Sequence, residues 1–174
     1  MISIRQSPPS DAELIQWSLD NPGVRFEYVN GVVTVSPTTG KSGVRTSLLN
    51  IKLGVWAKSH GYTSFGSSTL FHFDELQVSP DEVLILSERF NVLSDEEQDE
   101  TVTLVPDVAV EIISKSRGFG KTRGGVLPKC NAMYDSKVGY VLMLDPYATG
   151  SDRFVAWGCP PPNFPTDWDD ILNA

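Results

Sequence analysis

The sequence predicts a mixed α/β protein built around one central sheet. Three observations support this class: apolar residues at helical spacing in three segments, an Asn-Gly hairpin signal, and short apolar runs typical of buried strands. The 174 residues fit a single domain spanning 1–174. Within it we expect an N-terminal helix in 1–20 and a C-terminal tail over 158–174.

Composition and charge exclude several classes of protein. The 14 basic and 22 acidic residues give a net charge of -8, which disfavours nonspecific coating of nucleic acid. No apolar run approaches the roughly 18 residues that a membrane helix needs. The first residues lack the pattern of a secretory signal, so we expect an intracellular protein, without choosing between cytoplasm and nucleus. Two cysteines without a C-x-x-C pair disfavour a disulfide scaffold or a cysteine zinc site.

The N-terminal third predicts a helix and a hairpin. Ser10 and Glu13 have the spacing of a capping box, and Asn21-Pro22-Gly23 ends the helix. Residues 26–29 and 32–35 are strand-like runs joined by Asn30-Gly31, and an Asn-Gly pair favours a tight β-hairpin.

The rest of the chain predicts helices alternating with strands. A long amphipathic helix ends near Gly61, with an apolar face of Val44, Leu48, Leu49, Ile51, Leu53, Val55 and Trp56 and a polar face of Arg45, Asn50, Lys52 and Lys58. We expect strands at 62–73, 83–86, 105–113, 140–144 and 153–157. We also expect a helix carrying Leu127, Cys130, Met133 and Tyr134. The acidic run 95–100 is most simply a solvated loop, with or without a helical turn.

Carboxylates occur inside strands that are otherwise apolar. Asp107 and Glu111 share one face of the predicted strand 105–113, but four residues of strand span roughly 13 Å, too far for one cation. Asp81 opens the preceding apolar run and converges with Glu111 if the two strands pair. A wet edge strand or a buried salt bridge explains Glu111 equally well, and a polar strand start explains Asp81.

Five motifs together resemble a known family. They are residues 26–31 (FEYVNG), Ser79-Pro80-Asp81, residues 106–114 (PDVAVEIIS), Lys129 with Tyr134, and residues 140–146 (YVLMLDP). In order and spacing, from about 21 to 157, they resemble the Uma-type restriction endonuclease family of the PD-(D/E)XK nuclease superfamily. The resemblance implies a restriction-endonuclease-like fold, with a central mixed sheet flanked by helices and an N-terminal β-hairpin.

The resemblance also implies roles for individual residues. Asp81 and Glu111 would bind Mg²⁺, with Mn²⁺ as a substitute, and Lys129 would complete the catalytic set. The superfamily's lysine two positions after the acidic residue is Ile113 here, so that element is broken. Lys115 is a rival for the lysine, and Glu27 and Asp107 are additional acidic candidates.

The function that follows is metal-dependent endonucleolytic hydrolysis of DNA, by a homodimer on family grounds. The alternative is a catalytically inactive nuclease fold that acts as a binding or assembly module, which the broken element and the acidic pI favour. Arg117, Lys121 and Arg123 lie in or beside a glycine-rich segment. Solvated charge is the simpler interpretation of these three residues, and contact with the substrate backbone is the alternative.

Overall fold

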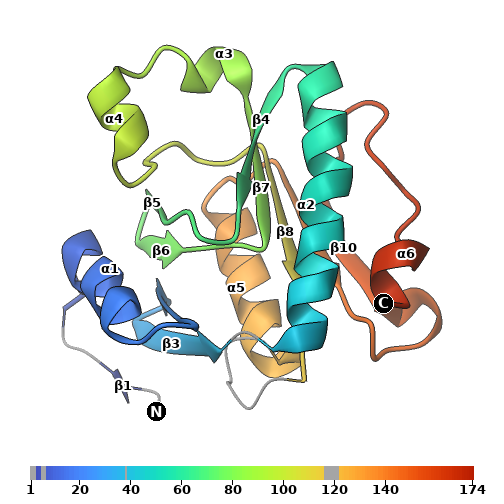
Figure 1. Cartoon of the computed structure of the whole chain (residues 1–174), viewed down its shortest axis with the longest axis horizontal. Helices are drawn as coiled ribbons and strands as arrows, with labels where there is room; N and C mark the ends of the chain where they lie inside the picture. Colours follow the sequence, from blue (N-terminus) through green and yellow to red (C-terminus); the bar gives the residue numbers. More distant parts are fainter. Residues whose placement is uncertain (1–2, 5–6, 38, 116–121) are drawn as a thin grey trace.

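The computed structural model describes residues 3–4, 7–37, 39–115 and 122–174, which form two five-stranded sheets with flanking helices (Figure 1). The strands are β1 (Ser3–Ile4), β2 (Val24–Val29), β3 (Val32–Pro37), β4 (Tyr62–Gly66), β5 (Phe71–Phe73), β6 (Leu76–Val78), β7 (Glu82–Leu86), β8 (Val108–Ile112), β9 (Tyr140–Leu144) and β10 (Phe154–Gly158). The helices are α1 (Asp11–Asp20), α2 (Gly40–His60), α3 (Ser87–Phe90), α4 (Asp95–Asp99), α5 (Arg123–Asp135), the 3₁₀ helix η2 (Gly150–Arg153) and α6 (Asp169–Leu172). None of these helices is both long and apolar enough to cross a membrane.

The first sheet contains the predicted hairpin. β2 and β3 pair antiparallel, and the turn residues Asn30 and Gly31 have φ values of 50° and 80°, as such a turn requires. The strand order β1-β3-β2-β6-β5 shows that this hairpin belongs to a sheet of its own. The prediction of one central sheet is therefore wrong in this respect, because β6 pairs with β2 of the hairpin, β5 pairs with β6, and neither strand joins the second sheet.

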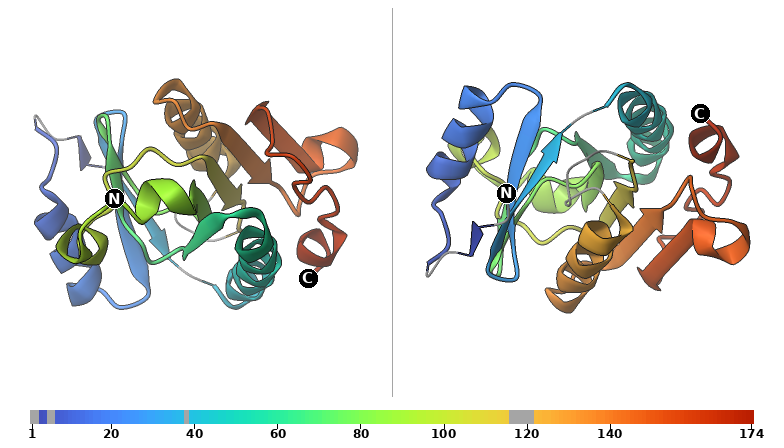
Figure 2. Two further views of the ribbon diagram at one scale, coloured as in Figure 1. Left: turned by 90° about the horizontal axis from the view of Figure 1, so that it is seen from above. Right: turned by 90° about the horizontal axis from the view of Figure 1, so that it is seen from below.

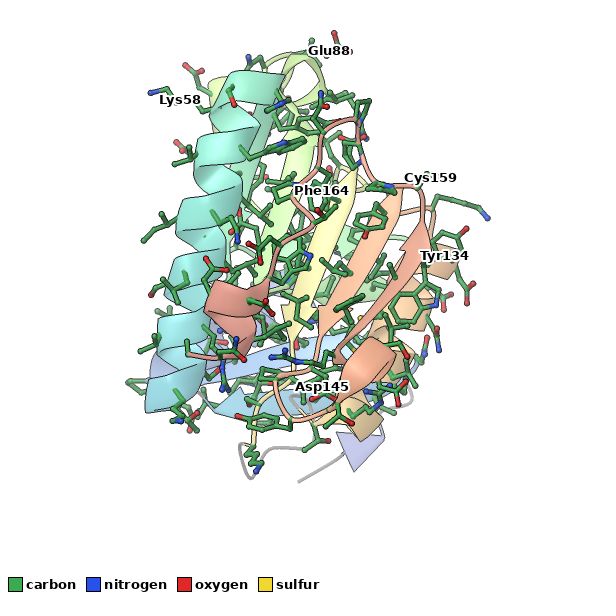
Figure 3. All side chains as sticks on the ribbon, turned by 90° about the vertical axis from the view of Figure 1, so that its right-hand side faces the viewer. Lys58, Glu88, Tyr134, Asp145, Cys159 and Phe164 are labelled. Atoms are coloured by element: carbon green, nitrogen blue, oxygen red, sulfur yellow. The ribbon has the colours of Figure 1, made fainter. Side chains whose placement is uncertain are left out.

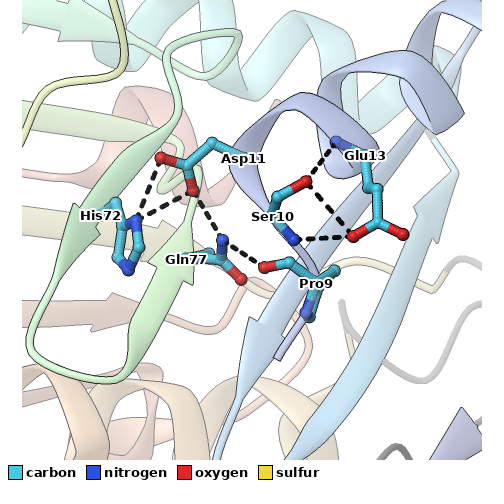
Figure 4. Close-up of polar contacts among 6 residues, drawn as sticks. All are labelled: Pro9, Ser10, Asp11, Glu13, His72 and Gln77. Atoms are coloured by element: carbon cyan, nitrogen blue, oxygen red, sulfur yellow. Dashed lines mark hydrogen bonds and ion pairs between the residues drawn. The ribbon is translucent and has the colours of Figure 1, made fainter. Parts of the chain in front are cut away.

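Helix α1 is fixed to the first sheet by polar contacts (Figure 4). The predicted capping box is present, with Ser10 and Glu13 each accepting from the other's backbone amide. Asp11 then accepts from Gln77 Nε2 at 2.6 Å, and its other oxygen lies 3.0 Å from His72 Nδ1. Gln77 Nε2 also donates to the carbonyl of Pro9. These contacts hold the start of α1 against β5 and β6.

The second sheet has the order β10-β9-β8-β7-β4. All neighbours are antiparallel except β8 and β9, which are parallel and joined through α5. Helices α2 and α5 cover opposite faces, as Figures 1 and 2 show. One apolar cluster joins α5 to Val83 and Ala109, and the other joins α2 to Leu84 and Val110.

Helix α2 buries a different face from the predicted one. Leu49, Leu53 and Trp56 are buried as expected, but Arg45 from the predicted polar face is buried with them. Three residues of the predicted apolar face point to solvent instead, with exposed fractions of 54% at Val44, 65% at Ile51 and 71% at Val55. The helix has two apolar stripes, and the stripe with the larger side chains packs on the sheet because it removes more apolar area from water.

The C-terminal tail covers the sheet beside α2 (Figure 3). Phe164 and Trp168 are buried in the same cluster as α2, together with Ile171 and Leu172 of the short helix α6. The Phe164 ring lies 5.3 Å from the ring of Trp56, centre to centre, and Trp56 Nε1 donates to the carbonyl of Asn163. The tail, although mostly irregular, therefore completes one of the two main apolar clusters.

Several predicted boundaries are corrected. The predicted strand 62–73 breaks after Gly66, and its two parts, β4 and β5, join different sheets. The predicted strand 105–113 shortens to β8. The acidic run 95–100 takes the alternative with a helical turn: Asp95–Asp99 form the five-residue helix α4, because Ser94 and Glu97 make a second capping box.

We predict that Phe164→Ala lowers the free energy of unfolding by about 3 kcal/mol, because it removes a buried ring and leaves a cavity. Urea denaturation of the two proteins measures the difference. Val92→Ala is the control: Val92 is 81% exposed, and we expect a change within about 0.5 kcal/mol. Equal effects of the two substitutions would show that the tail does not stabilise the fold.

Candidate active site

Glu27, Glu111 and Lys129 meet between the two sheets, and Asp81 lies beside them against the backbone of β8. Glu27 comes from β2, Asp81 precedes β7, Glu111 lies in β8, and Lys129 lies on α5. All four are almost fully buried, with exposed fractions of 1%, 2%, 0% and 3% in that order. Burial of so many ionisable groups is costly unless they are paired.

Strand pairing places Asp81 beside Glu111. β7 and β8 pair antiparallel with Glu82 opposite Val110, so extending the register by one residue puts Asp81 opposite Glu111. Side chains that face each other across a ladder lie on the same side of the sheet. This is the side covered by α5, because Val83 and Ala109 pack in the apolar cluster of that helix. The Ile112 amide donates to Asp81 Oδ2 at 2.8 Å and fixes the orientation of this carboxylate.

Lys129 joins the two sheets electrostatically. Its Nζ lies 2.5 Å from Oε1 of Glu27 and 2.5 Å from Oε1 of Glu111. Burial alone lowers the pKa of Lys129, but the charges of Glu111 and Glu27 outweigh burial and raise the pKa above its ordinary value. Lys129 is therefore protonated at neutral pH.

Ser79 connects Glu27 to the chain segment that carries Asp81. Its backbone amide donates to Glu27 Oε1 at 2.7 Å, and its carbonyl accepts from Arg25 Nη1 at 3.2 Å. Ser79 therefore holds the hairpin next to Asp81 through two side chains of β2.

A buried acid on the opposite face of the sheet adjoins the site. Glu82 is 0% exposed and accepts hydrogen bonds from Asn50 of α2 and Ser64 of β4. Asn50 Nδ2 also donates to the carbonyl of Asp81 at 2.9 Å. Burial is the main cause that raises the pKa of Glu82, its hydrogen bonds from Ser64 and Asn50 oppose this, and the nearby charge of Asp81 adds to it; together they bring the pKa to about 7. Glu82 thus ties α2 to the segment that carries Asp81.

The remaining sequence candidates lie elsewhere. Asp107 sits at the far end of β8, where it accepts from the Leu86 amide and pairs with Arg89 at 2.8 Å. Lys115 follows the end of β8 and is exposed, with its Nζ 4.7 Å from the ring centre of Tyr147. Of the two rival lysines, Lys129 is the one that pairs with Glu111.

The predicted basic cluster is only partly described. Arg117 and Lys121 lie outside the described residues. Arg123 is the first residue of α5, and its Nη1 lies 2.9 Å from Oδ2 of Asp145. The Arg123 guanidinium is therefore paired with Asp145, the residue that follows β9.

Sequence reasoning did not rank Glu27 and missed Ser79, Asn50 and Glu82. A signal existed for Glu27, because an acid in the middle of an apolar hairpin strand is unusual. Glu82 gave a similar signal as a second acid at the start of an apolar run. Ser79 acts through its backbone, and neither its role nor that of Asn50 is readable from residue type.

The donors present suit a hard divalent cation. Among the described residues, no three His, Cys, Asp or Glu side chains form a group that could hold a metal ion. Mg²⁺ needs only one or two carboxylates and completes its shell with water and phosphate oxygens. Asp81 and Glu111, facing each other on neighbouring strands, fit that requirement, whereas a zinc site would need three or four protein ligands.

A mixed sheet between helices, with acidic side chains on two adjacent antiparallel strands, defines a restriction-endonuclease-like fold. A putative nuclease of the DUF820 group from Anabaena variabilis shares this fold, with a TM-score of 0.66 and 15% sequence identity over 92% of this chain and 97% of that chain. The chain belongs to the Uma2 family, described as putative restriction endonuclease, whose family profile matches residues 11–154. No curated protein matches the chain significantly. The predicted fold class and family are thus confirmed.

We predict that Lys129→Met destabilises the protein by about 3 kcal/mol at pH 7, because it leaves two buried carboxylates without their shared cation. Chemical denaturation measures the loss. Lys58→Met, at an exposed position near the end of α2, is the control and should change stability within about 0.5 kcal/mol. A stable Lys129→Met protein would show that the buried ion pairs contribute nothing to the fold.

A second prediction concerns pH. Because the pKa of Glu82 is about 7 in the fold and ordinarily 4.5, the native chain binds more protons than the unfolded chain between these values. The contribution of Glu82 to stability is therefore lost as pH rises through this window, by roughly 2–3 kcal/mol in total. Denaturation of the protein and of Glu82→Gln from pH 4.5 to 8, in EDTA, should show this fall only in the parent protein. Glu88→Gln, at an exposed position, should leave the pH profile unchanged.

Proposed function

We propose that the chain is a metal-dependent endonuclease that hydrolyses DNA phosphodiester bonds, with Mg²⁺ as the cofactor. The observation that carries this proposal is the register of β7 and β8, which extended by one residue places Asp81 opposite Glu111, together with the contact of Lys129 with Glu111. The family and the fold support nuclease activity in general. The metal and the DNA substrate are the proposed part.

Asp81 and Glu111 are the proposed metal ligands. When bound, Mg²⁺ or its substitute Mn²⁺ supplies a water of lowered pKa and screens the phosphoryl oxygens. The Ile112 amide and the pairing of the strands orient the two carboxylates before substrate arrives. Such preorganisation means that little reorganisation is needed when charge develops during the reaction.

Lys129 is proposed as the group that stabilises negative charge. Its raised pKa keeps the ammonium protonated at neutral pH, which suits a hydrogen-bond donor and disfavours a general base. Glu27 shares the ammonium with Glu111 and so sets the position of Nζ. Glu27 is accordingly a positioning residue in this proposal.

A binding or assembly module without catalysis is the second candidate. Two observations favour it: Ile113, in the place of the superfamily's lysine, packs in the apolar cluster under α5, and Lys129 is held in two buried ion pairs. Such ion pairs also have a purely structural explanation. The homodimer implied by the resemblance stays a prediction, which sedimentation of the purified chain tests.

We predict that Glu111→Gln and Asp81→Asn each reduce cleavage of supercoiled plasmid in Mg²⁺ at least about a hundredfold, because each removes a charge that the reaction needs. Initial rates of nicking measure the effect, with Mg²⁺ affinity followed by calorimetry. Glu96→Gln, at an exposed position of α4, is the matched control and should cleave at the parental rate. If the parent neither cleaves nor binds metal, the nuclease proposal is wrong and the binding module is favoured.

A further inference from the structure

A hollow lies beside the candidate active site, at the open edge of β2. β2 pairs with β6 only at Tyr28 and Gln77, so the ladder to β6 does not extend along residues 24–27. Between this edge, helix α1 and the segment after β4 is a cavity of about 350 Å³. This volume falls within the roughly 300–1,000 Å³ typical of ligand pockets.

The lining of this cavity is apolar with one positive charge. Its apolar part comprises Leu14, Ile15, Leu19, Val24, Phe26 and Leu70, and serines contribute hydroxyl groups. Arg25 is the charged residue among the described residues that line it, and no acidic residue appears there. In a chain with a net charge of -8, a lining without acids complements an anion. An apolar wall beside a guanidinium suits a ligand with a flat apolar part and a phosphate.

Two backbone contacts connect the cavity to the acidic site. Ser79 lines the cavity, donates its amide to Glu27 and accepts at its carbonyl from Arg25. Arg25 and Glu27 are two residues apart on one strand and therefore project from the same face, roughly 7 Å from each other. Ser79 therefore borders both the cavity and the acidic site, and this places the two next to each other.

Helix α1, which forms one wall of the cavity, is held in place by several contacts, and the side chains at the rim of the cavity (its lip) are exposed. The contacts of Asp11 with His72 and Gln77 hold α1 in place (Figure 4). Trp17 packs edge-on against Phe26, with ring centres 5.8 Å apart. At the lip, Ile15 is 44% exposed and Leu19 is 68% exposed. These two apolar side chains gain burial when a base enters the cavity.

We propose that this cavity receives an unpaired base of the substrate strand, with the phosphate of that nucleotide on Arg25; this inference rests on the proposed nuclease function. A base must leave the duplex stack to enter such a cavity, which is cheapest in a single-stranded or locally unpaired segment. The enzyme accordingly prefers DNA with unpaired nucleotides beside the bond that it cuts.

Fluorescence anisotropy of a labelled oligothymidylate of about twelve nucleotides, in EDTA, tests the inference without cleavage. Arg25→Gln and Ile15→Glu should each weaken binding at least about fivefold, because they remove the cation or place an acid at the lip. Lys58→Gln and Val92→Glu make matched charge changes at exposed positions and should change binding by less than about twofold. The parent should bind a duplex of the same length more weakly.

Equal weakening by all four substitutions, or no binding by the parent, would overturn the inference. If Arg25→Gln lowers the thermal midpoint because its bond to Ser79 is lost, Ile15→Glu alone decides. Plasmid nicking by the parent keeps the two proposals apart. If the parent nicks plasmid but the cavity substitutions do not weaken oligonucleotide binding, the nuclease proposal stands and the cavity proposal is wrong. If those substitutions weaken binding but the parent does not nick plasmid, the cavity binds DNA and the nuclease proposal is wrong.

Discussion

The contact of Lys129 with Glu27 and Glu111 is the interaction on which the arrangement of the molecule depends. Each partner comes from a different unit: the hairpin of the first sheet, the centre of the second sheet, and the helix that covers that sheet. Apolar packing brings these units together without direction, whereas two short ion pairs on one ammonium fix their relative positions. The same contact places a positive charge beside the carboxylates of the proposed metal site. Fold and chemistry therefore share one structural requirement.

Local sequence patterns predicted the parts of the fold that local physics controls. The capping box at Ser10 and the turn at Asn30-Gly31 are short-range devices, and both are present as expected. The division into two sheets was not predictable in this way. It depends on the pairing of Gln77 in β6 with Tyr28 in β2, a long-range contact that leaves no local pattern in the sequence.

The site shows the same limit. Residue types and strand order were enough to select Asp81 and Glu111 as candidates, since a buried carboxylate is costly and needs a reason. Lys129 became a candidate only through the family resemblance, because nothing in the spacing from Glu111 to Lys129 indicates that a helix folds back over β8. The sequence marks Glu27 as an unusual acid in a strand, but its partner Lys129 becomes visible only when the two sheets are in place. Ser79 shows the limit most clearly, because its contribution comes from the main chain.

The stretch of sequence that the family profile matches is shorter than the stretch that builds the apolar core. The family is recognised over residues 11–154, yet Phe164, Trp168, Ile171 and Leu172 supply part of an apolar cluster. A gene trimmed to the recognised stretch would still encode Glu27, Asp81, Glu111 and Lys129. Its product would nonetheless expose the face of the sheet beside α2, and a large uncovered apolar face promotes aggregation. An expression experiment therefore needs the C-terminal tail as well as the residues that the family profile matches.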